Sequence, residues 1–318
     1  MSCEVRREGD ATSRWRCLSV FMAKKAKVSS SVTEQRQLRP RPVTKDPDQP
    51  IRSQPDSDMS WGYGQKDGPS TWAENFPDAN GPRQSPVDIV PGDAQFERSL
   101  ANNPITINYN EEPDLEVENP GLSFKVNIKA DSTITGGPLG NAKYKLVQFH
   151  FHWGHDDDSG SEHTVNGKMY ASELHLVHYN TEKYASFAEA VTHSDGLSVI
   201  GVFIRVAPGD HKGFQTLAEN AEKVKCKASK VSTGQSFNPV VLLPGNTSKY
   251  WTYEGSLTTP PCCESVRWIV LKDEITISPE QIRSMRNLCC DDCGKSPIPA
   301  NFRPPLPLGS REIQASFQ

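Results

Sequence analysis

The stretch Gln148-Phe149-His150-Phe151-His152-Trp153 decides how this chain of 318 residues is interpreted. Its polar and aromatic residues alternate with the two-residue period of a β-strand, so Gln148, His150 and His152 share one face and the aromatic side chains share the other. Two neighbouring imidazoles on one face are costly unless something binds them, and a metal ion binds both. The stretch therefore predicts a strand with a metal-binding face.

A second alternating stretch, Glu173-Leu174-His175-Leu176-Val177-His178, places Glu173, His175 and Val177 on one face. If the two strands are antiparallel neighbours, His175 completes a cluster of three histidines. Three neutral imidazoles leave the fourth position of a tetrahedral Zn²⁺ open to water, as in catalytic zinc sites. Gln148 and Glu173 each lie two residues before a histidine on the same face, so each is predicted to accept the outward N–H of an imidazole.

A His-x-His pair alone is weak evidence, because cupin barrels also use one, followed within a few residues by a glutamate. Here the next glutamate is Glu162, ten residues past His152, so the cupin pattern fits poorly. The other histidines have no comparable partners and are interpreted as structural or surface residues: His155, His163, His178, His193 and His211.

The rest of the pattern consists mainly of short alternating runs between turn signals, which predict strands. These runs cover residues 105–109, 122–128, 143–152, 173–179, 197–206 and 266–272. Three short helices are predicted over residues 184–193, 212–225 and 279–288, the last with Ser278 as N-cap and Pro279 at its first position. The predicted fold class is mixed α/β but β-dominated: a single domain around a large, mostly antiparallel twisted central sheet with short peripheral helices.

The composition limits the functional classes. No apolar run approaches the roughly 20 residues that span a bilayer, which excludes an integral membrane protein, and a net charge of −4 argues against a dedicated nucleic-acid binder. Residues 1–58 carry twelve basic and eight acidic side chains without a sustained period. They are predicted to form a disordered basic extension, either a targeting segment or the product of an alternative start, and residues 59–318 the folded domain.

Cysteines give no clear signal for a site. Cys290 and Cys293 form a CxxC beside Cys289, but no second ligand pair for a structural zinc lies nearby and no βαβ pattern precedes it. These three cysteines are interpreted as part of a reduced surface loop, and their role stays open.

Several segments, in order along the chain, are similar to the α-class carbonic anhydrases of cytosolic type. They are Trp61-Gly62-Tyr63-Gly64, residues 84–89 (QSPVDI), residues 148–153, residues 160–164 (GSEHT), residues 173–178 and residues 250–261 (YWTYEGSLTTPP). The resemblance runs from about Trp61 to Phe317. It implies a zinc enzyme that hydrates CO₂ reversibly to bicarbonate and a proton by means of zinc-bound hydroxide.

The resemblance implies three zinc ligands: His150, His152 and His175. Backbone near Asn301 would orient His152. Thr258 would accept the hydrogen bond of the hydroxide and donate its own proton to Glu162, while Thr259 would position bicarbonate. The apolar wall for CO₂ would comprise Val177, Val199, Leu257, Val266 and Trp268, all of which also fit ordinary core positions.

One position departs from the fastest members of the family, which place a proton-shuttling histidine at the cavity mouth. The equivalent residue here is Leu122, which carries no proton, and the ammonium group of Lys125 suits a relay at pH 7 poorly. Tyr63 remains to order water in the cavity. Hydration is therefore predicted to be intact, with a maximal rate limited by proton transfer.

The resemblance also bears on the compartment. Extracellular members pair a cysteine near the start of the domain with one just after the TTPP segment. Cys262 occupies the second position, but Ala79 stands at the first, which implies a free thiol and a reducing compartment. A cytoplasmic location is predicted, with mitochondrial import through the extension as the alternative. The protein is expected to be a monomer whose ligands are CO₂ and bicarbonate.

Other functions fit these residues less well. A catalytically silent binding relative would typically lack a zinc-ligand histidine, and ester hydrolysis would be a weak side activity of the same site. A serine hydrolase is disfavoured because no G-x-S-x-G motif exists. Nucleotide binding is disfavoured because Gly294-Lys295-Ser296 lacks the upstream glycine of a phosphate loop.

Overall fold

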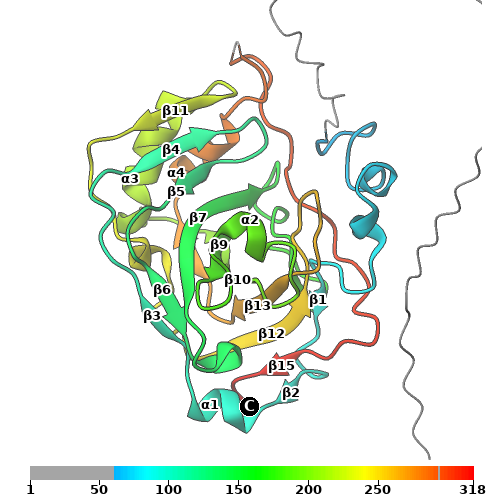
Figure 1. The fold of residues 1–318 in the computed structure, drawn as a ribbon. Helices are drawn as coiled ribbons and strands as arrows, with labels where there is room; N and C mark the ends of the chain where they lie inside the picture. The colour runs from blue at the N-terminus through cyan, green and yellow to red at the C-terminus, as the bar shows by residue number, and fades with distance from the viewer. Residues whose placement is uncertain (1–60, 293) are drawn as a thin grey trace, which may run out of the picture. The chain divides into compact units, whose positions relative to one another are not determined.

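The centre of the fold is a set of three long neighbouring strands, β7 (Tyr144–Trp153), β9 (Ser172–Asn180) and β10 (Leu197–Val206) (Figure 1). The structure is a computed structural model that describes residues 61–292 and 294–318. The predicted extension over residues 1–58 lies outside the described residues. β9 pairs antiparallel with both β7 and β10, and its side chains are buried almost throughout because sheet covers both of its edges and core covers its faces.

Within the described residues these strands belong to a sheet of thirteen. On one side it continues through β5 (Lys125–Asn127), β4 (Glu116–Asn119) and β11 (Ser229–Ser232). On the other it continues through β13 (Val266–Leu271), β12 (Tyr250–Gly255), β15 (Gln314–Ala315) and β2 (Gln95–Phe96). Off this path lie β14 (Ile275–Ile277) beside β10, and β6 (Thr133–Thr135) between β3 (Thr106–Asn108) and β7. A separate pair joins β1 (Asp88–Ile89) to β8 (Thr164–Val165).

The sheet is mixed, and the prediction of a mostly antiparallel sheet is corrected here. β10 pairs in parallel with β13 and β14, and β15 pairs in parallel with β2. Parallel neighbours require a long crossover, which residues 207–265 provide between β10 and β13. Alternation shows which side chains share a face of one strand, but it carries no information about the direction of the strand's partner.

The helices are short and lie outside the central strands. They are α1 (Arg98–Asn102), α2 (Phe187–Ala190), α3 (Lys212–Ala221) and α4 (Pro279–Arg286), with 3₁₀ turns η1 (Trp72–Glu74), η2 (Pro77–Asn80), η3 (Gly137–Leu139), η4 (Glu222–Val224) and η5 (Pro239–Leu242). α4 begins as predicted, since Ser278 and Gln281 cap it reciprocally. The helix predicted over residues 184–193 is reduced to the single turn of α2, and the one over residues 212–225 divides into α3 and η4.

The two faces of β7 point into different parts of the interior. Phe149, Phe151 and Trp153 are buried in the larger hydrophobic cluster. A smaller cluster contains Val177 of β9 and Trp268 of β13. The predicted alternation along β7 is therefore confirmed, because its aromatic face packs into the main core while the imidazole face is left for the site.

His178 of β9 is a structural histidine, in agreement with its interpretation. Its ring is buried, with Nδ1 3.2 Å from the carbonyl oxygen of Ser198 and Nε2 2.8 Å from the hydroxyl of Tyr109. Burial lowers the pKa of His178 from 6.5 to about 3, so the ring is neutral in the folded protein at neutral pH.

This neutral ring predicts a loss of stability in mild acid. The unfolded chain takes up a proton at His178 below pH 6.5, whereas the folded chain does so only near pH 3. As the pH decreases between these values, the free energy of unfolding therefore falls by about 1.4 kcal/mol per pH unit. Urea unfolding of the protein and of a His178→Gln variant checks this at pH 7.0 and 5.5. The wild type should lose about 1 kcal/mol more than the variant across that interval. Equal losses would show that His178 does not set the difference.

Candidate metal centre

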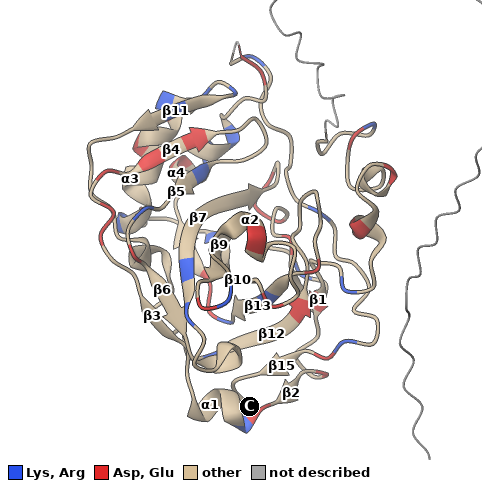
Figure 2. Ribbon diagram, viewed as in Figure 1, with Lys and Arg blue, Asp and Glu red and all other residues tan. Residues whose placement is uncertain are grey.

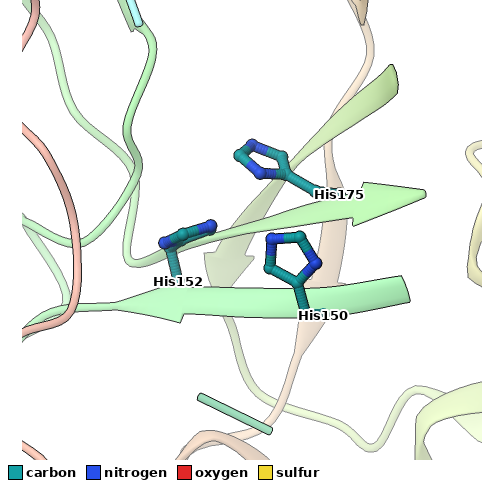
Figure 3. A group of neighbouring side chains, drawn as sticks. All are labelled: His150, His152 and His175. Carbon is teal, nitrogen blue, oxygen red and sulfur yellow. The ribbon is translucent and has the colours of Figure 1, made fainter. Parts of the chain in front are cut away.

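Three imidazoles converge between β7 and β9 (Figure 3). The register places His150 directly opposite His175 in an antiparallel pair, as the sequence predicted for neighbouring strands. Ring centroids lie 5.1 Å apart for His150 and His152, 5.3 Å for His150 and His175, and 4.6 Å for His152 and His175. One ring nitrogen from each lies within 4.8 Å of the other two, so the three side chains can hold one metal ion.

Each imidazole is held in place from its outer side. His150 Nδ1 donates to Gln148 Oε1 at 2.9 Å, His152 Nδ1 to the carbonyl oxygen of Asn301 at 2.7 Å, and His175 Nε2 to Glu173 Oε1 at 2.7 Å. These acceptors place the protons on the outer nitrogens, which leaves lone pairs on Nε2 of His150 and His152 and on Nδ1 of His175. The Nε2 of His152 is buried without a hydrogen-bond partner, a condition that metal coordination would relieve.

The charge states of the rings fit a zinc site. Burial is the largest cause that lowers the pKa of each of the three imidazoles, for His152 from 6.5 to about 3. Neutral imidazoles are the form that binds metal, and three of them match the ligand set of a catalytic zinc. The residues present therefore fit Zn²⁺, which His150, His152 and His175 would hold.

Glu173 organises the loop behind the site. Its Oε2 accepts the backbone N–H groups of Glu162 and His163 at 2.9 and 2.8 Å, and its Oε1 accepts His163 Nδ1 as well as His175 Nε2, each at 2.7 Å. Burial alone would raise the pKa of Glu173, but the adjacent imidazoles of His163 and His175 and their hydrogen bonds lower it well below its ordinary value. The carboxylate thus stays ionised beside its imidazoles.

His163 is a buried structural histidine, one of the two roles predicted for it, but its partners were not predicted. It binds Glu173, and its Nε2 lies 2.7 Å from the hydroxyl of Tyr253. No strand period connects His163 to either partner, because it lies in the loop before β8. The Glu-His pair within residues 160–164 was the only local signal that could have pointed to it.

Glu162 has one carboxylate oxygen fixed and one free. Oε1 accepts the backbone N–H of Arg303 at 2.8 Å, while Oε2 is buried and without a partner of standard geometry. Burial raises the pKa of Glu162 well above its ordinary value, and the nearby hydroxyl of Thr258 is the largest influence that lowers it. Thr258, which is also buried, therefore lies close to the Glu162 carboxyl group.

Arg303 joins this site to the start of the domain, and the sequence analysis did not single it out. Its buried guanidinium donates to Gln84 Oε1 and to the carbonyl oxygens of Ser85 and Ala79, at 2.9 to 3.1 Å. These contacts fix the backbone N–H that binds Glu162, across 141 positions of sequence. Such a contact has no local sequence pattern.

The predicted apolar wall lies together in the smaller hydrophobic cluster. The register places Val199 of β10 between Val177 of β9 and Trp268 of β13. Val266 is buried in the same cluster and Leu257 packs against it. The ring of Trp268 lies 4.8 Å from the ring of His175. These side chains are part of the smaller hydrophobic cluster, and they also place apolar surface next to the three histidines of the metal centre.

The remaining predicted residues surround the site less closely. Leu122 is half-buried and its carbonyl oxygen accepts Asn301 Nδ2 at 2.9 Å. Lys125 lies opposite His150 in the register, and its Nζ forms a 2.7 Å ion pair with Glu118 Oε1, part of the mixed charges on β4, β5 and β11 (Figure 2).

Tyr63 and Thr259 complete the predicted set. Burial and then the charge of Glu162 raise the pKa of Tyr63 well above 10, so its hydroxyl stays protonated. Thr259 is half-buried, and its carbonyl oxygen accepts the N–H of Cys262 at 2.9 Å. Their roles toward substrate stay predictions.

Comparison with known proteins defines the class. Residues 67–317 match the model of the eukaryotic-type carbonic anhydrase family, and the chain belongs to this family of zinc-dependent lyases. The resemblance found in the sequence is thereby confirmed. Carbonic anhydrase 1 of Mus musculus is 44% identical over 262 residues, 81% of this chain and 98% of that protein. Carbonic anhydrase 7 of Homo sapiens is 46% identical over 263 residues, 81% of this chain and 97% of that protein. In the described part of the chain, no helix has the length and apolarity to cross a membrane.

Proposed function

We propose that this chain catalyses the reversible hydration of CO₂ to bicarbonate and a proton. The observation that carries the proposal is the free Oε2 of Glu162 next to Thr258, close to three imidazoles whose inner nitrogens converge. A silent binding relative needs neither feature. A buried polar atom without a partner destabilises a fold, and the presence of two here, His152 Nε2 and Glu162 Oε2, supports a site kept for chemistry.

Each residue of the site has a separate role in the reaction. Zn²⁺ held by the three histidines would lower the pKa of a water molecule to about 7 and so supply a nucleophile at neutral pH. Thr258 donates its proton to Oε2 of Glu162, which leaves its own oxygen as an acceptor toward the attacking water. This fixed direction of donation aims a lone pair at the carbon of CO₂. The apolar wall around Trp268 favours an uncharged substrate, and Thr259 positions bicarbonate.

Stopped-flow measurement of CO₂ hydration by the full chain, with zinc content measured on the same sample, tests the proposal. We expect one zinc per chain and a rate that a chelator removes and zinc restores. A fully zinc-loaded, folded protein without activity would favour the silent relative. A folded protein that binds no zinc would overturn the whole assignment.

The absence of a histidine at Leu122 predicts a rate limited by proton transfer. With saturating CO₂, kcat should rise with added imidazole buffer, and a Leu122→His variant should raise kcat about tenfold at low buffer, since positioned proton transfer contributes at least that much. Leu122→Gln is the matched control, because it preserves the backbone carbonyl that binds Asn301 but cannot shuttle protons. A wild-type rate insensitive to buffer would refute this prediction.

We also propose a cytoplasmic location, and a catalytic domain that begins near residue 59. Cys262 is buried as a free thiol and packs in one small cluster with Ala79, the position where extracellular relatives would have its partner. Burial raises the pKa of Cys262 to about 11, so the thiol is protonated at neutral pH. N-terminal sequencing of the protein from fractionated cells tests both proposals. Recovery from a secreted fraction would contradict the cytoplasmic location. A mature N-terminus well inside residues 59–318 would contradict the proposed start of the catalytic domain.

A further inference from the structure

Cys226 and Cys289, which the metal centre does not use, are brought together by the fold. Cys226 follows η4 and Cys289 follows α4, 63 positions later. The N–H of Cys289 donates to the carbonyl oxygen of Lys225 at 2.8 Å, and the N–H of Lys227 donates to that of Asp291 at 2.9 Å. These bonds join the residues on either side of Cys226 to Cys289 and Asp291, so the two segments form one hydrogen-bonded contact.

A buried side chain holds this contact together. Nδ2 of Asn119, at the end of β4, donates to the carbonyl oxygens of Lys225 and Cys289 at 3.0 and 2.9 Å. Asn119 is buried, so this bifurcated contact ties Cys289 to the residue just before Cys226 from within the fold. The contact is thus part of the packed structure.

The spacing of the backbones suits a disulfide. The N–H of Cys289 is bonded to the carbonyl oxygen of the residue just before Cys226, so the two backbones adjoin, as a disulfide with Cα atoms roughly 4.4 to 6.8 Å apart requires. Burial is the largest cause that raises the pKa of the Cys289 thiol, and Asp291, Cys226 and Cys290 raise it further.

The two thiols differ in access to solvent. Cys226 is half-buried, and its Sγ faces Gly294, where a Cβ atom would lie only 3.2 Å away. The glycine therefore leaves room beside this sulfur. Cys289 is 2% exposed. An oxidant from solvent would meet Cys226 first, and the buried thiol of Cys289 would be protected until then.

We propose that Cys226 and Cys289 form a reversible disulfide when the protein meets a peroxide. The Cys226 thiol attacks the peroxide oxygen to give a sulfenic acid and, from hydrogen peroxide, one water. Cys289 then attacks that sulfur, and the S–O bond breaks as the S–S bond forms, releasing a second water. Two thiols have lost two electrons and two protons, and one peroxide has been reduced. A thiol reductant reverses the step.

Peptide mapping of the full chain locates the bond. Trypsin releases residues 226–227 as Cys-Lys and residues 287–295 as a peptide with Cys289, Cys290 and Cys293. After brief treatment with hydrogen peroxide and blocking of free thiols, we expect these two peptides to be joined, with fragmentation placing the link on Cys289. Dithiothreitol should release it. A link confined to the 287–295 peptide, or placed on another cysteine, would overturn the assignment.

Variants provide a second readout. Cys226→Ser and Cys289→Ser should lose the joined peptide, whereas the matched control Cys290→Ser should keep it. Oxidation should raise the Tm of the wild type and of Cys290→Ser by roughly 5–10 °C, because the bond closes a long loop in the unfolded chain. An equal rise in Cys226→Ser would contradict the proposal. If a variant folds poorly when reduced, the wild-type fragmentation spectrum still decides between the cysteines.

Discussion

Replacing His175 with alanine is expected to abolish stoichiometric zinc binding and to lower kcat/KM for CO₂ hydration by at least about a thousandfold, since the metal supplies the nucleophile. His175 is the histidine that β9 contributes, and its ring lies 4.6 Å from that of His152. Without it only the two imidazoles of β7 remain, too few for a catalytic zinc site. Metal analysis and stopped-flow hydration on the same preparations measure the effect.

The design of this experiment separates loss of metal from loss of fold. Glu173 still binds His163 and two backbone N–H groups after the change, so the variant should remain folded, which thermal unfolding checks. His193→Ala is the matched control, because His193 is exposed and its Nδ1 bonds to the carbonyl oxygen of Glu189, outside the cluster. A folded His175→Ala protein with full zinc and near-normal activity would remove this cluster from the mechanism.

Glu162→Gln is expected to leave zinc bound and to lower kcat by about 10²–10³-fold, the usual cost of one misdirected hydrogen bond in an active site. Oε1 of Glu162 is committed to the backbone N–H of Arg303. A glutamine must keep its only oxygen there, so its amide N–H groups would face Thr258. The hydroxyl would then have to accept rather than donate, and the lone pair toward the attacking water would be lost.

Paired substitutions test whether Glu162 acts through Thr258. Thr258→Ala should reduce kcat by a similar factor, and the double variant should be little worse than either single one, because the two residues act as a unit. Thr258→Ser keeps a hydroxyl and is the matched control. Multiplicative losses in the double variant would mean that Glu162 and Thr258 contribute independently, and the proposed direction of donation would be wrong.

Much of the site could be predicted from local sequence, because several of its residues lie two positions apart on one strand and so share a face. The pairs Gln148 with His150 and Glu173 with His175 follow from the period of a strand, and the hydrogen bonds found in the structure match them. The span predicted over residues 197–206 coincides with β10. Short elements were less well predicted: α2 is one turn in a segment with enough apolar residues for a longer helix.

By itself, the sequence determined the strands that carry the histidines, the face on which each side chain lies and, through resemblance, the family. Only the tertiary structure decided which strands are neighbours and in which direction, why Glu162 has one oxygen free, and that the segments carrying Cys226 and Cys289 adjoin. The physical reason is the sequence separation over which each kind of interaction acts. Side-chain direction along a strand depends on local backbone geometry, whereas the partners supplied by Arg303 and Asn119 come from positions more than 100 residues away, and only the packed core brings them there.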